Sequence, residues 1–315
     1  MKADNVDGNF DRQSLKRNDD SWIAKELLDK NSRFLLYRDN SFLVTTDSAV
    51  DFLDKSIAES YSKSNLEWKF LGQKPQTEDE DSQKISVFGT SLSDSNEKAI
   101  NANWQSLRRI ALHLSATDVN LLFYAQGLFN WHSSHHFCNY CGNNLIQTQS
   151  GHGLKCSSKD CAKEIFPRTD PAIIVLVYFK DTCLLGRQAQ WPERMYSCLA
   201  GFIETGETIE GAVAREVYEE SGLSIKQVKY QGSQPWPFPQ SLMLGFHAEA
   251  SNQDLTFHDK EIEDARWFTR KELITAVTNN ELRLSTPVSI SYRLLEDWFN
   301  LDSDRPLASY LKNEE

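Results

Sequence analysis

Residues 201–223 read GFIETGETIEGAVAREVYEESGL. This stretch indicates the fold of the C-terminal half. Five of its glutamates (Glu207, Glu210, Glu216, Glu219 and Glu220) accompany one arginine, Arg215. Thr208 is a suitable N-cap, and Gly222 is a suitable left-handed stop. The apolar residues between them (Ile209, Ala212, Val213 and Val217) recur every three or four positions. The stretch therefore predicts a helix over residues 208–221 with one face against a core.

The acidic residues of this helix are crowded. Glu216 and Glu220 share one face, and Glu219 lies at its edge. Like charges at this spacing repel, so three acids within five residues favour a cation among them. Oxygen ligands suit hard divalent ions such as magnesium or manganese, which also bind diphosphates. A solvated acidic helix face is the alternative, and the charge pattern alone does not separate the two.

The complete spacing of the stretch resembles the Nudix box without a departure. The nine matching positions are Gly201, Glu207, Arg215, Glu216, Val217, Glu219, Glu220, Gly222 and Leu223. That family hydrolyses nucleoside diphosphates linked to another moiety. The resemblance implies an α/β/α sandwich in which a loop, a helix and a second loop hold catalytic metal ions.

Composition and charge limit the other classes of protein. The chain has 315 residues, enough for about two domains, with 40% hydrophobic and 25% charged residues, as in ordinary globular proteins. Its formal net charge of −11 argues against broad electrostatic binding to nucleic acid or anionic membranes. The N-terminus lacks the apolar segment of a secretory signal, and the C-terminus lacks a peroxisomal tripeptide. We therefore expect a cytoplasmic location, with an organellar one left open.

Four segments are expected along the chain. Residues 1–20 are polar and predict a disordered tail. Residues 21–130 predict a small mixed α/β domain, with two strands within 32–46 joined at Asp39-Asn40, a charged loop at 76–83, a strand at 84–88 and a helix at 117–131. Residues 131–168 predict a zinc ribbon. Residues 169–315 predict the Nudix domain, with strands at 172–179, from 183, at 228–231, 242–250 and 266–268, and a helix at 290–298.

Two cysteine pairs form a second pattern. Cys138-x2-Cys141 is followed by Cys156-x4-Cys161, which predicts a four-thiolate zinc site. Because four thiolates leave no open position, this zinc is expected to be structural. Free buried thiols are the alternative. The nearby histidines (His132, His135, His136 and His152) are expected on the surface or in packing, and Cys183 and Cys198 in the core.

A proline-rich segment is the third pattern. Residues 233–241 read SQPWPFPQS, with three prolines in five residues, which predicts a stiff extended loop outside any central strand. Rigid aromatics such as Trp236 and Phe238 suit stacking on a base or a nicotinamide ring; a purely structural loop is the alternative. The loop, the box and the ribbon together resemble the NADH diphosphatase branch of the Nudix family over residues 130–300.

This resemblance implies a set of site residues. Glu216, Glu220, Glu261 and the carbonyl of Ala200 would bind magnesium or manganese, two or more ions per site, with Glu219 assisting. Arg215 would position the glutamates by ion pairing. Substrate contacts would come from Phe166, Phe202, Gln234, Pro235, Trp236, Pro237, Phe238, Pro239, Gln240, Ser241 and Ser291, the last standing where the branch has alanine.

The function implied by the resemblance is metal-dependent hydrolysis of a dinucleotide diphosphate. NADH or NAD⁺ would give nicotinamide mononucleotide and AMP, and the same site would remove NAD caps from RNA 5′ ends. Contact with RNA would be confined to the first nucleotides. The branch tends to form homodimers. The alternatives are hydrolysis of ADP-ribose or another nucleotide sugar, and a non-catalytic module in which the ribbon binds a partner.

Overall fold

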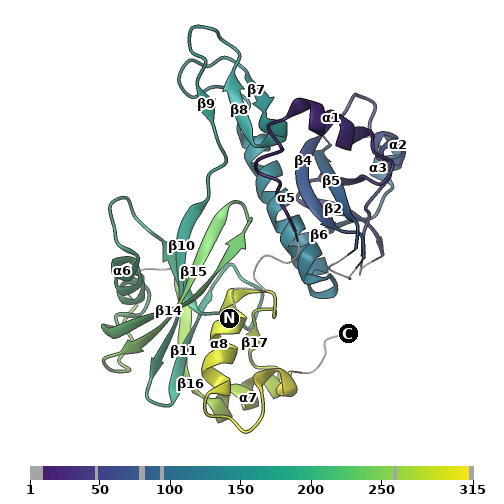
Figure 1. Ribbon diagram of the computed structural model, residues 1–315. Helices are drawn as coiled ribbons and strands as arrows, with labels where there is room; N and C mark the ends of the chain where they lie inside the picture. Colours follow the sequence, from purple (N-terminus) through teal and green to yellow (C-terminus); the bar gives the residue numbers. More distant parts are fainter. Residues whose placement is uncertain (1–9, 47–48, 78–81, 93–95, 258–260, 312–315) are drawn as a thin grey trace. The chain divides into compact units, whose positions relative to one another are not determined.

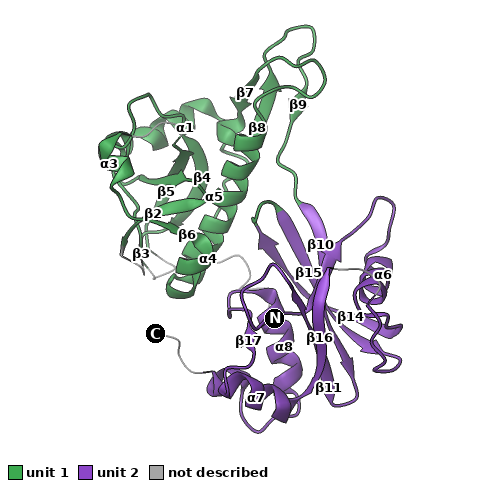
Figure 2. Cartoon of the chain, turned by 180° about the vertical axis from the view of Figure 1, so that it is seen from behind, with its two compact units in different colours: residues 1–169, 237–240 green, residues 170–236, 241–315 purple. Residues whose placement is uncertain are grey.

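The computed structural model describes residues 10–46, 49–77, 82–92, 96–257 and 261–311. The chain divides into two compact units. The first comprises residues 1–169 with Pro237–Gln240, and the second comprises Asp170–Trp236 with Ser241–Glu315 (Figure 2).

A mixed six-stranded sheet organises the second unit (Figure 1). Its main path runs β14-β15-β10-β11-β16, and β13 pairs with β10. The bounds are β10 Asp170–Phe179, β11 Thr182–Gln188, β13 Leu199–Phe202, β14 Ile225–Trp236, β15 Ser241–Ala250 and β16 Ile262–Thr269. β10 and β15 are parallel, and the other pairs are antiparallel. A separate two-stranded pair joins β12 (Met195–Tyr196) to β17 (Arg283–Leu284).

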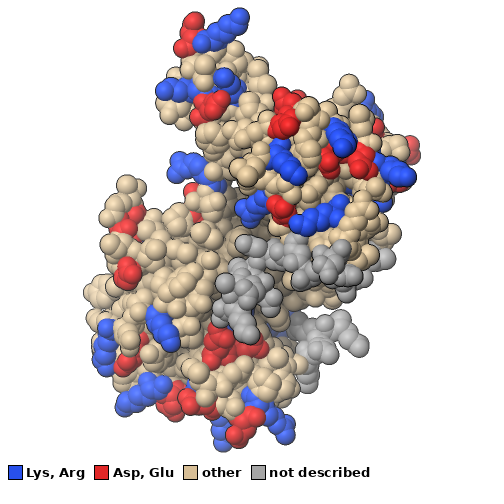
Figure 3. Space-filling model, in the orientation of Figure 1, with Lys and Arg blue, Asp and Glu red and all other residues tan. Residues whose placement is uncertain are grey.

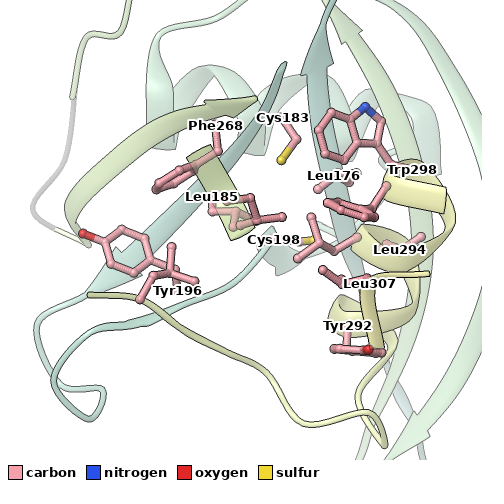
Figure 4. Close-up of a cluster of buried hydrophobic side chains, with 14 of the residues drawn as sticks. Leu176, Cys183, Leu185, Tyr196, Cys198, Phe268, Tyr292, Leu294, Trp298 and Leu307 are labelled. Atoms are coloured by element: carbon pink, nitrogen blue, oxygen red, sulfur yellow. The ribbon is translucent and has the colours of Figure 1, made fainter. Parts of the chain in front are cut away.

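Helices cover both faces of this sheet because β10 is apolar on both. Ile173, Val175 and Val177 face one core with α6 (Ile209–Ser221). Ile174 and Leu176 face the other core, with α7 (Arg270–Thr278) and α8 (Ile290–Asn300). Figure 4 shows part of this second core, including Trp298 of α8. The expected α/β/α sandwich is confirmed.

The first unit contains a second mixed sheet, in the order β3-β2-β1-β5-β4, with β6 paired to β2. The bounds are β1 Arg33–Arg38, β2 Ser41–Thr46, β3 Ala49–Val50, β4 Lys69–Pro75, β5 Lys84–Ser91 and β6 Trp104–Ser106. Its helices are α1 Asp20–Leu28, α2 Lys55–Glu59, α3 Glu97–Ile100, α4 Leu107–Ile110 and α5 Ala116–Ser134. α5 packs on the sheet so closely that a side chain at Gly89 would lie 2.7 Å from the ring of Phe129.

The remainder of this unit is a small three-stranded antiparallel sheet, formed by β7 Leu145–Thr148, β8 Gly153–Cys156 and β9 Glu164–Ile165. Short 3₁₀ turns lie at Ala111–His113, Gln149–Gly151 and, in the second unit, Leu307–Tyr310. α5 crosses the expected boundary between the N-terminal domain and the ribbon, which lies between residues 130 and 131. The division of this unit into those two domains stays a prediction.

Most of the expected elements are present. The turn Asp39-Asn40 joins β1 to β2, and both residues have positive φ, as a tight hairpin requires. Residues 1–9 of the expected tail, and 78–81 of the expected charged loop, lie outside the described residues. Within residues 10–19, Asp11 forms a β-bridge with Gln73, and the expected disordered tail stays a prediction.

The proline-rich segment differs from the expected loop. β14 continues through Trp236, and Pro235 lies opposite Leu242 of β15. β14 is an edge strand, where the missing N–H of proline breaks no central ladder. Only residues 237–240 form a turn, and the Phe238-Pro239 bond is cis. Among the helices that the structure describes, none is both long and apolar enough for a membrane span.

We predict that Leu176→Ala lowers the free energy of unfolding by about 2–5 kcal/mol, because it opens a cavity in the core beneath α8. Leu176 is fully buried, whereas Leu301 at the end of α8 is 75% exposed. Leu301→Ala is therefore the matched control and should change stability by less than about 0.5 kcal/mol. Urea unfolding of both variants tests the difference, and equal losses would contradict this account of the core.

Candidate active site and metal sites

Helix α6 begins and ends where the sequence indicates. The Thr208 hydroxyl accepts a hydrogen bond from the Gly211 N–H at 3.1 Å, and Gly222 ends the helix with φ 72°. A side chain at Gly222 would also lie 2.8 Å from Thr256, so glycine is required there for space as well as conformation. These ends fix the rotation of the helix and so the direction of its acidic side chains.

The Arg215 guanidinium lies at the centre of the candidate active site. It forms a bidentate pair with Glu207, with Nε at 2.8 Å and Nη2 at 2.9 Å from the two carboxylate oxygens. Its Nη1 donates to Glu216 at 2.8 Å and to Glu219 at 3.0 Å. Nη2 also donates to the carbonyl of Phe202 at 2.9 Å. One arginine thereby fixes three acids and the loop before the helix.

The two acids nearest Arg215 have opposite electrostatic environments. The hydrogen bonds from Arg215 lower the pKa of Glu207 to about 2. Burial raises the pKa of Glu216, although Arg215 opposes this, and the charges of Glu219 and Glu261 raise it further. Arg215 therefore stabilises the charged form of Glu207, whereas burial disfavours the charged form of Glu216.

Gly201 makes room for the Glu216 carboxylate. A Cβ built at Gly201 would lie 2.0 Å from Glu216 Cδ and 2.1–2.2 Å from both carboxylate oxygens. The backbone of β13 and the carboxylate thus approach within a distance that only glycine permits. Ala200, the neighbouring residue of β13, pairs with Ile174 of β10. An oxygen-rich cradle of this kind suits a hard divalent cation.

Glu220 and Glu261 are the other two acids of the predicted metal set. Glu220 is 3% exposed on the buried side of α6. Glu261 precedes β16 and accepts a hydrogen bond from Gln188 Nε2 at 2.8 Å, and its charge acts on Glu216. Within the described part of the chain, however, the only group of three or more His, Cys, Asp or Glu residues whose ligand atoms gather within 4.8 Å is the set of four cysteines. The roles of Glu216, Glu219, Glu220 and Glu261 as metal or catalytic residues therefore stay predictions.

The expected substrate contacts divide into exposed and buried groups. Gln234 is 8% exposed, and its amide accepts from Ile290 N at 2.7 Å and donates to Val288 O at 2.6 Å. Ser291 is 4% exposed and accepts from Cys198 N at 3.1 Å. Both side chains are engaged within the second unit, so they support backbone segments in this structure.

The aromatic members of the set are more accessible. Phe202, directly after Gly201, is 59% exposed, and Phe166 in the first unit is 51% exposed. Trp236 ends β14 at partial exposure, and Ser241 begins β15 opposite it. Pro237, Phe238, Pro239 and Gln240 belong to the first unit, where the first three contact α5.

The four predicted zinc ligands lie together. Cys138 Sγ is 3.8 Å from Cys161 Sγ, and Cys141 Sγ is 3.4 Å from Cys156 Sγ. The Gly142 N–H donates to the Cys138 carbonyl at 2.8 Å, and Gly142 has φ 74°, so the first pair sits on a tight knuckle. Sulfur ligands at this spacing suit zinc.

The four nearby histidines were expected on the surface or in packing. Two of them, His132 and His152, serve in packing. His132 Nε2 donates to the Gly151 carbonyl at 2.7 Å. His152 Nε2 donates to the Phe70 carbonyl at 2.7 Å, and the Tyr124 hydroxyl donates to its Nδ1 at 2.8 Å. Burial lowers the pKa of both imidazoles to about 4, so they are neutral near pH 7. Cys183 and Cys198 are buried in the second unit, as expected.

Three residues near these sites were not predicted. Gln188 bonds Glu261, and Gln126 and Asn130 of α5 bond the turn at 237–240. Gln188 carries no pattern of its own. Gln126 and Asn130 did offer a signal, since two amides four residues apart interrupt the apolar stretch of a long helix.

Family models match both units. Residues 168–286 match the model of the NUDIX domain. Residues 31–131 match the model described as an NADH pyrophosphatase-like rudimentary NUDIX domain.

Curated relatives are about 40% identical to this chain over an aligned region of 202 residues. The human NAD-capped RNA hydrolase NUDT12 is 40% identical over 202 residues, which cover 61% of this chain and 44% of that protein. The NAD-capped RNA hydrolase NudC of Mycobacterium bovis is 41% identical over 202 residues, covering 61% of this chain and 64% of that protein. The matched region thus spans less than two thirds of these relatives. A crystal structure of a NUDIX hydrolase from Nitrosomonas europaea matches 53% of this chain and 91% of that chain, with 20% identity and a TM-score of 0.40.

We predict that Gly201→Ala weakens Mn²⁺ binding by about 10- to 100-fold, because the methyl group displaces the Glu216 carboxylate. Gly232→Ala is the control, since a Cβ there would meet nothing within 4 Å. Titration of each variant with Mn²⁺, followed by electron paramagnetic resonance, measures the change. Unchanged Mn²⁺ affinity in a folded Gly201→Ala protein would contradict a metal role for Glu216.

We also predict that Cys156→Ser lowers zinc content well below one ion per chain and exposes the ribbon to proteolysis. Cys183→Ala, in the core of the second unit, should leave the zinc content unchanged. Elemental analysis of the purified proteins gives the zinc content, and limited proteolysis locates any cleavage. Full zinc content in Cys156→Ser would rule out a site formed by all four thiolates.

Proposed function

Because the chain belongs to the NADH diphosphatase branch of the Nudix superfamily, we propose that it hydrolyses the diphosphate of NADH and NAD⁺. The products are nicotinamide mononucleotide and AMP. The observation that carries the proposal is the Arg215 cluster, which holds Glu216 against Gly201 on an intact Nudix box. A vestigial box would not need to keep a close approach that only glycine allows.

The acids of the box and of the β16 edge are the proposed metal ligands. Glu216, Glu220, Glu261 and the Ala200 carbonyl would hold two or more Mg²⁺ or Mn²⁺ ions. When bound, such ions polarise the phosphoryl oxygens and lower the pKa of coordinated water. The oxygen donors and the Gly201 cradle fit ions of this class.

The other residues orient the reacting groups. Arg215 fixes the rotamers of Glu207, Glu216 and Glu219, so that these acids lose little conformational entropy when a cation binds. The same guanidinium holds the Phe202 carbonyl, which places the exposed Phe202 ring for stacking on the nicotinamide. Trp236 would contribute further aromatic surface for the substrate, and the contacts expected of Phe166 and Phe238 rest on the family resemblance alone.

NAD-capped RNA 5′ ends are a proposed second substrate, because the cap presents the same diphosphate beside the same nicotinamide. Two relatives of about 40% identity carry the name NAD-capped RNA hydrolase. Figure 3 shows acidic and basic side chains interspersed on the drawn face, without a large basic field. We therefore propose that RNA is contacted at its first nucleotides only.

The state of the protein in the cell is proposed on the same basis. We propose a homodimer, as is usual in this branch, and a cytoplasmic location. The rival activity is hydrolysis of ADP-ribose or another nucleotide sugar, and a panel of NADH, NAD⁺, ADP-ribose and an NAD-capped oligonucleotide at one salt concentration separates the substrates. The exposed Phe202 and the partly exposed Trp236 favour a substrate with two bases.

We predict that the parent protein with Mn²⁺ converts NADH to nicotinamide mononucleotide and AMP, and that Glu220→Gln lowers kcat/KM by at least about 100-fold. The substitution keeps the size of the side chain and removes its charge. Chromatography of the products measures both results.

Glu210→Gln is the matched control, because it makes the same change at an exposed position in the first turn of the same helix. It should retain kcat/KM within about twofold of the parent. A folded Glu220→Gln protein that hydrolyses NADH at the parental rate would contradict the proposed metal-binding role of Glu220.

A further inference from the structure

Helix α5 carries two amide side chains on a face that is otherwise apolar. Gln126 is fully buried among residues such as Leu122 and Phe129, and Asn130 follows one helical turn later. A buried amide is unfavourable unless it forms hydrogen bonds. The bonds that these two amides form therefore indicate why polar residues occupy this face.

Both amides bind the turn at residues 237–240, which belongs to the same unit. Gln126 Nε2 donates to the Pro237 carbonyl at 2.8 Å. Asn130 Nδ2 donates to the Pro237 carbonyl at 3.1 Å and to the Pro239 carbonyl at 3.0 Å. The Tyr37 hydroxyl donates to Asn130 Oδ1 at 2.9 Å, which fixes the orientation of the amide. Residues more than 100 positions apart thus form one hydrogen-bonded network.

The ring between the two prolines is also held. The Arg108 guanidinium lies 4.3 Å from the centroid of the Phe238 ring, and Phe123 of α5 meets that ring edge-on at 6.2 Å. A Cβ at Gly127 would lie 3.6 Å from Pro237, so the turn rests directly on the helix. Phe238 therefore contributes to anchoring the turn.

The other end of the segment is fixed separately. Gln234 bonds Val288 and Ile290 at the start of α8. Trp236 lies two residues after Gln234 and one residue before Pro237, so the chain is anchored on both sides of this residue. Anchoring at both ends reduces the conformational freedom that Trp236 loses when it stacks on a base.

We propose that Gln126 and Asn130 are positioning residues, which hold the 237–240 turn so that Trp236 is ordered before the dinucleotide binds. This inference rests on the proposed function for its substrate, an NADH-type dinucleotide. Its physical consequence is specific: releasing the turn weakens substrate binding and leaves the acids of α6 unchanged. KM is therefore expected to change while kcat does not.

The sharpest test is Asn130→Asp. Aspartate has the size of asparagine and still accepts the Tyr37 hydrogen bond, but it replaces the two donated bonds with a carboxylate facing two carbonyls. We expect KM for NADH to rise about 5- to 10-fold, with kcat within about twofold of the parent. Hydrogen–deuterium exchange should accelerate at residues 233–241, with little change in α6.

Two further variants keep the test decisive. Ser133→Ala is the control, because Ser133 lies on the same helix and its hydroxyl bonds only the Asn130 carbonyl of that helix; KM and exchange should both stay at the parental values. Asn130→Ala removes the donors without adding charge, and it serves if the aspartate variant does not fold. A folded Asn130 variant with parental KM, or with parental exchange at 233–241, overturns the proposal.

The outcomes also separate this inference from the proposed function. A purely structural role would lower the melting temperature and the active fraction, and so kcat, without raising KM. If the parent fails to hydrolyse NADH, the proposed function fails. Hydrogen–deuterium exchange still reports whether Asn130 anchors the turn, because that measurement needs no substrate.

Discussion

The ion pairs of Arg215 are the constraint on which the candidate active site depends. One guanidinium joins the first loop of the box, through Glu207 and the Phe202 carbonyl, to the helix, through Glu216 and Glu219. Arginine suits this position because its planar fork presents several donors in fixed directions, which a lysine ammonium does not. The same arrangement explains the close approach of Glu216 to Gly201. Arg215 binds the Glu216 carboxylate, and the missing side chain of Gly201 leaves room for it.

The proline-rich hairpin follows a similar logic with neutral groups. Its strand end is tied to α8 by Gln234, and its turn is tied to α5 by Gln126 and Asn130. Amide side chains suit this task because they can donate to the carbonyls of Pro237 and Pro239, which lie in the turn and outside the strand ladder. The second unit thus supplies the strands, and the first unit includes the turn.

The sequence predicted what local patterns encode. The caps of α6 at Thr208 and Gly222, the alternating cores on β10 and the four-cysteine cluster all follow from spacing within a few residues. It did not predict that β14 extends through Trp236, because a proline is excluded only from central strands and edge position is a tertiary property. Gln126, Asn130 and Gln188 were missed for the same reason: their partners are distant in the chain.

The charges of the crowded acids are only partly balanced by Arg215. Arg215 contacts Glu207, Glu216 and Glu219, so one positive charge stands against three negative ones and a deficit of two remains. The hydrogen bonds from Arg215 lower the pKa of Glu207, whereas burial raises the pKa of Glu216 against the effect of Arg215, and the charges of Glu219 and Glu261 raise it further. Arginine alone therefore does not neutralise the cluster. A divalent cation is a counter-ion that would offset the remaining charge of these acids, and the metal role of Glu216 stays a proposal.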